Sequence, residues 1–523
     1  MKALRSETDA WGKGAFAAAV GATLIDRLMV LIGFGLRYTG ADDVVFWTAA
    51  SDMANGIFRE PFLYGQNYNP AFESLVAVPL LWLGAPIQAA MPVATSILAL
   101  APFLSWAAWE AHRGRWTAGA LLAACPALLP IEWGLMTTMT RGFVNGLALL
   151  ALLPWVLSIR RAEMRDGLLG FLAAAAVAVN PNALPLAATF IVWHIWTNRG
   201  GLKGVFCILG GALPALLAAW AGYHFYAAHP ERVVHRIDDW RLTFHPAELI
   251  PEALGQLDRH FAWLCPLWWP NGEAVIWLLV AAVPLFLWLR RPGVSIALAA
   301  STSVVALSFA FPKTMDGHDH VVYPLSRMFL AMPLIMGWAA AQVPWGPRSA
   351  VTISRALLII APLLVGWKAL NLEAVIAQQF GEPLELPIAT ATIAALQADA
   401  DAIAEISASE GIDLVVAFSN DPEKRSAVLS YAAPLLNPHV PNTLFVGHDR
   451  RYHLRSASRN AVFPTILLLG CDDSIWDEGM RSLLGAFPAA IRGRRALLLR
   501  GNGMPLSEIL DRLGRDLGPL PAQ

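Results

Sequence analysis

Long apolar runs recur through the first 370 residues of the chain, and the charged side chains fall mainly between them. About 20 apolar residues in a helix suffice to cross a hydrocarbon core of about 30 Å. The pattern predicts eleven membrane-spanning helices, some of them short, at residues 15–36, 88–110, 117–130, 143–159, 167–180, 183–197, 204–222, 274–289, 293–311, 326–343 and 355–371. We therefore expect an α-helical polytopic membrane domain over residues 1–371.

The pattern changes in the last part of the chain. Residues 388–411 have the pattern of an amphipathic helix that ends at a glycine. Short β-rich runs follow at 414–418, 443–446, 466–469 and 496–499, with helical patterns around 422–433, 474–485 and 505–516. This alternation predicts a small α/β domain with a mainly parallel sheet over residues 372–523. No glycine-rich phosphate loop is present, so nucleotide binding is not supported. The basic stretch 448–455 forms either a solvated face or a contact with anionic headgroups or a glycolipid.

Compact basic clusters lie at alternate ends of the predicted spans. The positive-inside rule places these clusters, and the N-terminus, in the cytoplasm. The C-terminal domain and three long loops, at 37–87, 223–273 and 312–325, then fall outside. The apolar stretch 71–84 is too short to span and would invert every later loop, so we expect it to lie in the outer interface or to re-enter.

Composition narrows the class of protein. Hydrophobic residues make up 56% of the chain, and charged residues only 15%, against about 25% in soluble globular proteins. The formal net charge is −1, and the four cysteines show no metal-binding spacing. These values exclude a soluble enzyme and a nucleic-acid binder with a basic surface.

Two adjacent carboxylates, Asp42 and Asp43, follow the first predicted span. Partial burial at the mouth of an apolar bundle raises the pKa of a carboxyl group and suits it to general-base chemistry. Either residue could also cap the helix that follows. One of the two could therefore act as the base while the other caps the helix.

Residues 62–73 form the most informative segment of this first outer loop. Its aromatic and amide side chains suit stacking on a sugar and hydrogen bonding to it; they are Tyr64, Gln66, Asn67, Tyr68 and Asn69. Gly65 and the Asn69-Pro70 pair favour a tight turn equally well. Glu73 is a second carboxylate of the site, a metal ligand, or simply the polar start of the next helix.

The Asp pair, followed by YGQNYNPAFE at residues 64–73 and an apolar helix containing proline, resembles the GT-C membrane glycosyltransferases. The similar branch holds bacterial protein O-mannosyltransferases, aminoarabinose transferases and lipopolysaccharide-core galacturonosyltransferases. In motif the resemblance covers 37–84 and, more weakly, 312–333; in topology it covers 1–370. It implies a sugar donor on polyprenyl phosphate at the outer face, and a base or acceptor-orienting role for Asp42 or Asp43. Familiar members often have Asp-Glu here, so Asp-Asp is a departure.

The loop 312–325 and its flank carry the cations that such a donor needs. Lys313 and Arg327 suit the donor phosphate, as Arg141 does in the short outer turn unless it pairs with Glu132. His318 and His320 bind substrate, make hydrogen bonds within a polar loop, or hold a divalent metal. The candidate metal ligands are Asp43, Glu73, His318, Asp319 and His320. Within the first span, the adjacent Asp26 and Arg27 are predicted to pair with neighbouring helices.

We therefore expect a membrane glycosyltransferase, GT-C-like in fold, in the inner membrane of a bacterium. It would transfer a hexose or pentose, with inversion, from a polyprenyl-phosphate-linked donor to an envelope glycan such as lipopolysaccharide, a lipid or a protein. Its partners are this donor, the acceptor and membrane lipids, and no nucleic acid. The alternatives are a transporter or lipid flippase without chemistry, and a non-catalytic envelope assembly component. The crowding of ionisable groups in outer loops, rather than at mid-membrane, favours the enzyme.

Overall fold

The computed structural model describes residues 2–198, 201–235, 242–380, 390–418, 425–447, 449–483, 485–492, 494–500 and 503–518. The chain divides into two compact units. The helical unit comprises Met1–Phe34, Thr95–Trp220 and Asp238–Glu382. The mixed unit comprises Gly35–Ala94, Ala221–Ile237 and Pro383–Gln523. The first outer loop thus belongs to the same compact unit as the C-terminal segment.

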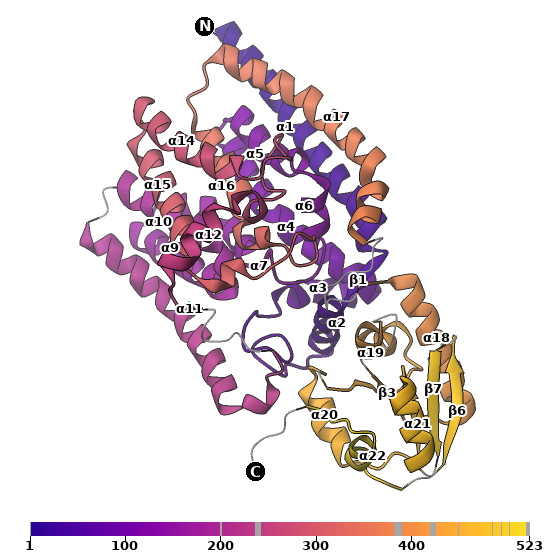
Figure 1. The fold of residues 1–523 in the computed structure, drawn as a ribbon. Coiled ribbons are helices and arrows are strands. Elements are labelled where there is room, and N and C mark those ends of the chain that lie inside the picture. The colour runs from indigo at the N-terminus through magenta and orange to yellow at the C-terminus, as the bar shows by residue number, and fades with distance from the viewer. Residues whose placement is uncertain are drawn as a thin grey trace. The chain divides into compact units, whose positions relative to one another are not determined.

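Helices cover most of each predicted span, although α1 and α17 are longer than predicted and the span at 143–159 is divided among short helices (Figure 1). They are α1 (Lys2–Val30), which a π-helical turn extends over Leu31–Gly35, α4 (Ile87–His112), α5 (Trp116–Leu128), α6 (Ile131–Met136), α7 (Asn145–Leu149), α8 (Leu153–Leu157), α9 (Ala162–Val179), α10 (Leu184–Thr197), α11 (Leu202–Ala228), α12 (Pro246–Leu254), α13 (Leu257–His260), α14 (Ala274–Trp288), α15 (Pro292–Ser308), α16 (Met332–Gln342) and α17 (Pro347–Phe380). Within the described residues, four helices are long and apolar enough to cross a membrane: Glu7–Gly35, Ile87–His112, Leu202–Ala228 and Pro347–Phe380. The number of spans therefore stays a prediction.

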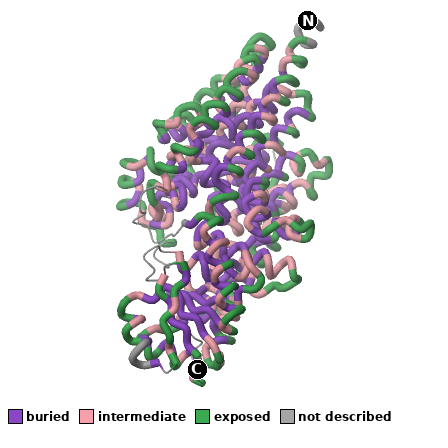
Figure 2. Tube along the Cα trace, turned by 90° about the vertical axis from the view of Figure 1, so that its right-hand side faces the viewer, coloured by how far each residue is buried: buried purple, intermediate pink, exposed green. Residues whose placement is uncertain are grey.

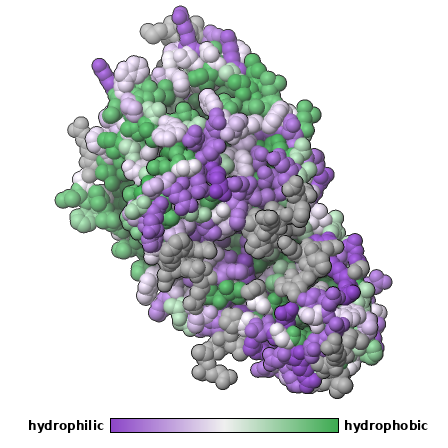
Figure 3. Space-filling view, in the orientation of Figure 1, coloured by the Kyte–Doolittle hydropathy of each residue, from purple (hydrophilic) through white to green (hydrophobic). Residues whose placement is uncertain are grey.

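The helical unit is hydrophobic both inside and outside. Most of its buried apolar residues form one core, and a smaller cluster lies where α1, α5 and α17 pack against one another. Figure 2 shows the buried residues on the inside of the helical part and exposed ones around them. Large apolar side chains also lie exposed along α11, α14 and α17, among them Phe206, Trp288 and Leu370. Figure 3 shows such hydrophobic side chains on the outside of the helical part. An apolar outer surface of this kind suits contact with lipid tails.

Close helix packing in this unit depends on small residues. A side chain at Gly170 would clash with the backbone of Ile208, and one at Gly211 with the backbone of Gly167. These glycines let α9 and α11 approach closely, as small residues do between membrane helices.

The mixed unit contains a five-stranded sheet in the order β4-β3-β5-β7-β6. Its strands are β3 (Leu414–Ala417), β4 (Thr443–Phe445), β5 (Thr465–Leu469), β6 (Ala486–Ile491) and β7 (Arg494–Arg500). The helices around it are α18 (Ile393–Glu410), α19 (Ser426–Leu436), α20 (Tyr452–Arg459), α21 (Asp473–Ser482) and α22 (Leu506–Arg512).

The prediction of a mainly parallel sheet is wrong for two of the four strand pairs. β3 pairs in parallel with β4 and β5, but β7 runs antiparallel to β5 and to β6. β6 was not predicted because its sequence, AFPAAI, holds Pro488 and little β-branched character. A proline is tolerated there because β6 is an edge strand.

The first outer loop and the C-terminal segment share one hydrophobic core. β1 (Tyr38–Gly40) pairs antiparallel with β2 (Thr390–Thr392), and α2 (Ala41–Ala54) packs against α19 and α3 (Phe72–Trp82). Phe46 and Trp47 of α2 are buried together with Leu429 and Val415 of the C-terminal segment. This core fixes the position of the loop's polar residues relative to those of the sheet.

Candidate functional site

The two adjacent carboxylates stand at the start of α2 and make different contacts. Asp43 is 4% exposed, and its Oδ2 accepts a hydrogen bond from the backbone N–H of Gly40, the N-cap residue, at 2.7 Å. Asp42 is half-buried, and its Oδ1 lies 2.6 Å from Nη2 of Arg450. Asp43 therefore does the capping that the sequence allowed to either residue, and Asp42 faces a guanidinium.

Arg450 lies in the loop between β4 and α20, and its backbone N–H donates to the hydroxyl of Tyr431 at 2.8 Å. Burial opposes the charge on Arg450, but the nearby Asp42 and Tyr431 hold the pKa of its guanidinium above the usual value. Asp42 and Arg450 therefore form a charged pair at the surface of α2.

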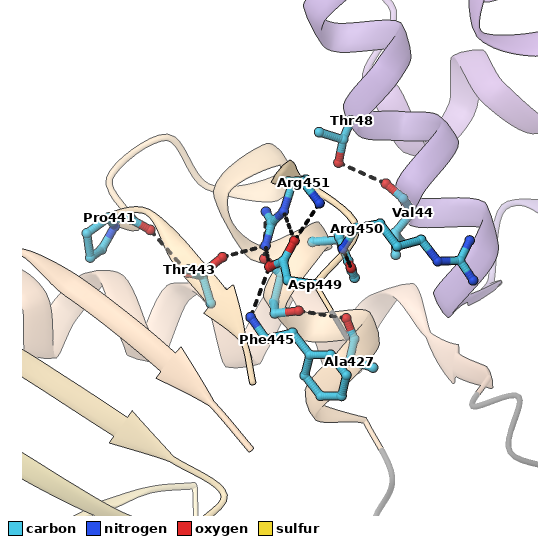
Figure 4. Close-up of polar contacts among 11 residues, drawn as sticks. Val44, Thr48, Ala427, Pro441, Thr443, Phe445, Asp449, Arg450 and Arg451 are labelled. Carbon is cyan, nitrogen blue, oxygen red and sulfur yellow. Dashed lines mark hydrogen bonds and ion pairs between the residues drawn. The ribbon is translucent and has the colours of Figure 1, made fainter. Parts of the chain in front are cut away.

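The remainder of the basic stretch is not a solvated face, so that interpretation is wrong for its described residues. Arg451 and Arg455 are each 3% exposed. Arg451 donates to both carboxylate oxygens of Asp449 and to the carbonyl oxygens of Thr443 and Ser430 (Figure 4). Asp449 also accepts from the backbone N–H of Phe445, so these residues tie the loop to β4. His448 lies outside the described residues.

Residues 64–69 form a tight turn against this loop. Gly65 has a φ of +71°, and a side chain there would collide with Cβ of Arg450. Asn69 has a φ of +64°, and its carbonyl oxygen accepts from the backbone N–H of Leu63 at 3.1 Å. The carbonyl oxygen of Gly65 accepts from two backbone N–H groups, those of Val234 and His235, at 2.9 Å each. The turn interpretation is thus confirmed, and the turn places the motif beside Arg450.

Some polar side chains of this turn form hydrogen bonds within the protein, and others are buried without a hydrogen-bond partner among the described residues. The Tyr64 hydroxyl donates to Oδ2 of Asp52 at 2.6 Å, and Arg59 Nε donates to the same oxygen at 2.7 Å. Gln66 is 6% exposed, and neither its Oε1 nor Oδ1 of Asn67 has a hydrogen-bond partner among the described residues. Each of these two buried oxygens is therefore an unsatisfied acceptor within the described part of the chain.

Two other predicted residues of the loop lie in the same unit. Tyr68 is close enough to Arg450 to help hold its positive charge. Glu73 lies fully buried in the first turn of α3. Asp42, Asp43, the turn and Glu73 thus all lie in the mixed unit.

A buried carboxylate that sequence reasoning missed lies in the same unit. Glu60 is 5% exposed, accepts from the Tyr226 hydroxyl at 3.1 Å and lies 3.6 Å from Arg232. Burial raises the pKa of its carboxyl group, against the lowering by Tyr226 and Arg232. Asp52, Arg59, Arg450 and His453 were missed too; only the charge of the stretch 448–455 gave a signal.

In the helical unit, the late outer loop forms a charged cluster of its own. Lys313 Nζ and the Tyr323 hydroxyl each lie 2.9 Å from Oδ2 of Asp316. Arg327 is 4% exposed, lies over the Tyr323 ring at 3.7 Å, and donates to the carbonyl oxygen of Asp316. Burial opposes ionisation of Asp316, but Lys313, Tyr323 and Arg327 lower the pKa of its carboxyl group. The structure thus brings two of the three predicted phosphate-binding cations, Lys313 and Arg327, together at the carboxylate of Asp316.

The histidines of this loop make protein contacts. The backbone N–H of His318 donates to the carbonyl oxygen of Tyr323 at 2.9 Å, and the His320 ring contacts the carbonyl oxygen of Gln379. Asp319 pairs with Arg259 at 2.7 Å. Within the described ranges no three His, Cys, Asp or Glu side chains are grouped to hold a metal ion.

Arg141 is 5% exposed in the helical unit. It lies near enough to His320 to act on it: burial lowers the pKa of the His320 ring, and Arg141 lowers it further. Arg141 and the histidine of the late loop are therefore neighbours, as a shared site requires.

The two ionisable residues inside the first span bond to neighbouring helices, as predicted. Asp26 Oδ1 lies 2.9 Å from Nζ of Lys368 on α17. Arg27 donates to the hydroxyls of Thr138 and Thr137 at 2.6 and 2.9 Å. Both side chains thus join α1 to its neighbours. In the long loop 223–273, residues 236–241 lie outside the described residues.

No protein-family model and no curated protein sequence matches the chain. Among solved structures, the chain is similar to the crystal structure of ArnT from Cupriavidus metallidurans bound to undecaprenyl phosphate. The two proteins are 13% identical with a TM-score of 0.48, and the alignment covers 92% of this chain and 97% of that chain. At this identity and score, the functional assignment depends on the residues described above.

Proposed function

We propose that the protein is a GT-C-type membrane glycosyltransferase that takes its sugar from a polyprenyl-phosphate donor. The observation that supports this proposal is that two parts of the family-like motif, Asp42 and the YGQ turn, both contact Arg450. Asp42 lies 2.6 Å from Arg450, and Gly65 of the YGQ turn packs on the same arginine. The carboxylate and the sugar-binding type of turn thus belong to one site.

In this proposal Asp42 orients or deprotonates the acceptor hydroxyl. Asp43 is buried and accepts from the helix cap, so Asp42 is the more accessible of the two. The acceptor oxygen attacks the anomeric carbon as the bond to the donor phosphate breaks, which inverts that centre. The hydroxyl proton goes to Asp42 or, through it, to water.

The departing phosphate needs cations at the membrane surface. Lys313 and Arg327, with Arg141, are the candidates. In the free protein the first two contact Asp316, so the phosphate would replace this carboxylate as their partner. The residues proposed to line the sugar sites are Tyr64, Gln66, Asn67, Tyr68, Asn69, Glu73, His318 and His320.

We place this reaction at the outer face of a bacterial inner membrane, with the N-terminus in the cytoplasm and the C-terminal domain in the periplasm. The acceptor would be an envelope glycan, a lipid or a protein. The basic clusters between the apolar helices support this orientation.

A membrane transporter or flippase is the second candidate. The Asp26–Lys368 ion pair supports it, because it joins two helices long enough to cross a membrane. If this pair served transport, breaking it would stop flux of a lipid or solute in proteoliposomes.

The test is donor consumption by purified protein in lipid, using a panel of radiolabelled polyprenyl-phosphate sugars and an envelope extract as acceptor. The proposal predicts consumption of at least one donor, with label transferred to the extract. Consumption of none of the donors, together with flux in proteoliposomes, would contradict it in favour of the transporter.

A further inference from the structure

Residues of the C-terminal segment hold Arg450 in place. Its backbone N–H donates to the Tyr431 hydroxyl of α19, and the neighbouring Arg451 is fastened to Asp449 and to β4. The side chain of Arg450 is only 12% exposed. The fold therefore presents this guanidinium at a fixed position rather than on a free surface loop.

The guanidinium has a donor left over. Nη2 contacts Asp42, but the buried Nη1 has no hydrogen-bond partner among the described residues. A buried donor without an acceptor is unfavourable, and such groups are rare in folded proteins. Arg451 gives the contrast, because its guanidinium is used by Asp449, Thr443 and Ser430.

The surroundings indicate what kind of group would use this donor. Asp42 already neutralises Arg450, which disfavours a free anion at the same place. The turn that packs on Arg450 continues with two buried carbonyl oxygens, those of the Gln66 and Asn67 side chains, that have no partner in the described part of the chain. A spare donor with spare acceptors suits sugar hydroxyls, because a hydroxyl both donates and accepts.

We infer that Arg450 is a residue of the acceptor-binding site, supplied by the C-terminal segment, which positions Asp42 through Nη2 and binds a hydroxyl of the acceptor sugar through Nη1. This inference rests on the proposed function. It gives the C-terminal segment a part in the reaction itself, since Arg450 of this segment contacts the carboxylate of Asp42 at 2.6 Å.

The test compares Arg450→Gln with Arg494→Gln as a matched control, in the full-length protein with the donor that wild type consumes. Arg494 lies on β7 of the same unit, and its side chain is 9% exposed and pairs with Asp399 at 2.7 Å. Arg450→Gln should raise the acceptor KM about 10- to 100-fold, the loss expected for one charge-assisted hydrogen bond, and leave the donor KM unchanged. As the pH is lowered, the rate of sugar transfer by Arg450→Gln should begin to fall at a higher pH than that of wild type. The reason is that a carboxylate without its guanidinium partner is protonated more readily. Arg494→Gln should lower the melting temperature and move neither the acceptor KM nor the pH profile.

A double variant separates positioning from a general structural effect. If Arg450 acts through Asp42, Asp42→Asn with Arg450→Gln should have the same kcat as Asp42→Asn alone. The inference is overturned if wild type transfers sugar while Arg450→Gln shows the acceptor KM and pH profile of Arg494→Gln. A wild-type protein that consumes no donor would instead overturn the proposed function, and this inference with it.

Discussion

Asp43 accepts a hydrogen bond from the backbone N–H of Gly40 at 2.7 Å and so closes the first turn of α2. Replacing Asp43 with Ala should lower the free energy of unfolding by about 1 kcal/mol, the usual value of a helix cap. Asp43→Asn, which keeps an acceptor, should lower it less. Thermal unfolding in detergent measures both, and equal stability of Asp43→Ala and wild type would show that the cap contributes nothing.

The Tyr64 hydroxyl should stabilise the turn through Asp52. This hydrogen bond to a carboxylate is 2.6 Å long and mostly buried, so Tyr64→Phe should cost about 1.5–3 kcal/mol of stability. Tyr223→Phe is the matched control, because Tyr223 is 53% exposed and contacts Phe62 by its ring. The two variants should differ in melting temperature, and a shared value would refute a stabilising role for the hydroxyl.

Lys313 should bind the donor if the late outer loop holds the phosphate. We expect Lys313→Met to weaken binding of a polyprenyl-phosphate donor by about tenfold, the loss of roughly one charge contact. Lys203→Met serves as control, because Lys203 forms an exposed pair with Glu163 in the same unit. Donor titration in nanodiscs measures both affinities. Unchanged donor affinity in Lys313→Met would remove Lys313 from the phosphate site.

His453 should make the protein less stable in mild acid. Burial lowers the pKa of its ring to about 4, with a further lowering by Arg59, whereas an unfolded histidine titrates at about 6.5. Between these values the unfolded chain binds a proton that the folded one excludes, so this stability is complete above about pH 6.5 and is lost as the pH falls towards 4. His453→Gln should therefore lose less stability than wild type between pH 7 and pH 5. Parallel losses in melting temperature would contradict this.

Breaking the ion pair between α1 and α17 should be more damaging than removing it. Lys368→Met leaves the Asp26 carboxylate buried without its partner and should cost about 3–5 kcal/mol. Lys368→Met combined with Asp26→Asn should recover part of this loss. Detergent melting curves of the single and double variants test this, and additive losses would mean that the two residues do not stabilise each other.

The apolar helices could be predicted because length and hydrophobicity alone indicate them. The α/β alternation was equally visible, but β6 was not, since Pro488 and three alanines carry no strand signal. The antiparallel half of the sheet follows from this missing strand, which forms a hairpin with β7.

The candidate site could be predicted only in part. Asp42 and the turn at residues 64–69 were found because they lie close together in sequence and carry a family-like motif. Arg450 lies about 400 residues away, and a run of arginines suggests a solvated surface unless the fold buries it. Its contact with Asp42 depends on the pairing of β1 with β2 and on the core shared by α2 and α19, which local patterns do not specify.

The central claim is that Asp42, and not Asp43, acts on the acceptor. The most direct measurement is the rate of label transfer from the donor that wild type consumes, in Asp42→Asn and Asp43→Asn side by side. The account predicts that Asp42→Asn lowers the rate by about 10²- to 10⁴-fold with donor binding intact, as the loss of a general base does, and that Asp43→Asn keeps most of it. A fast Asp42→Asn variant, or one no slower than Asp43→Asn, would contradict the account.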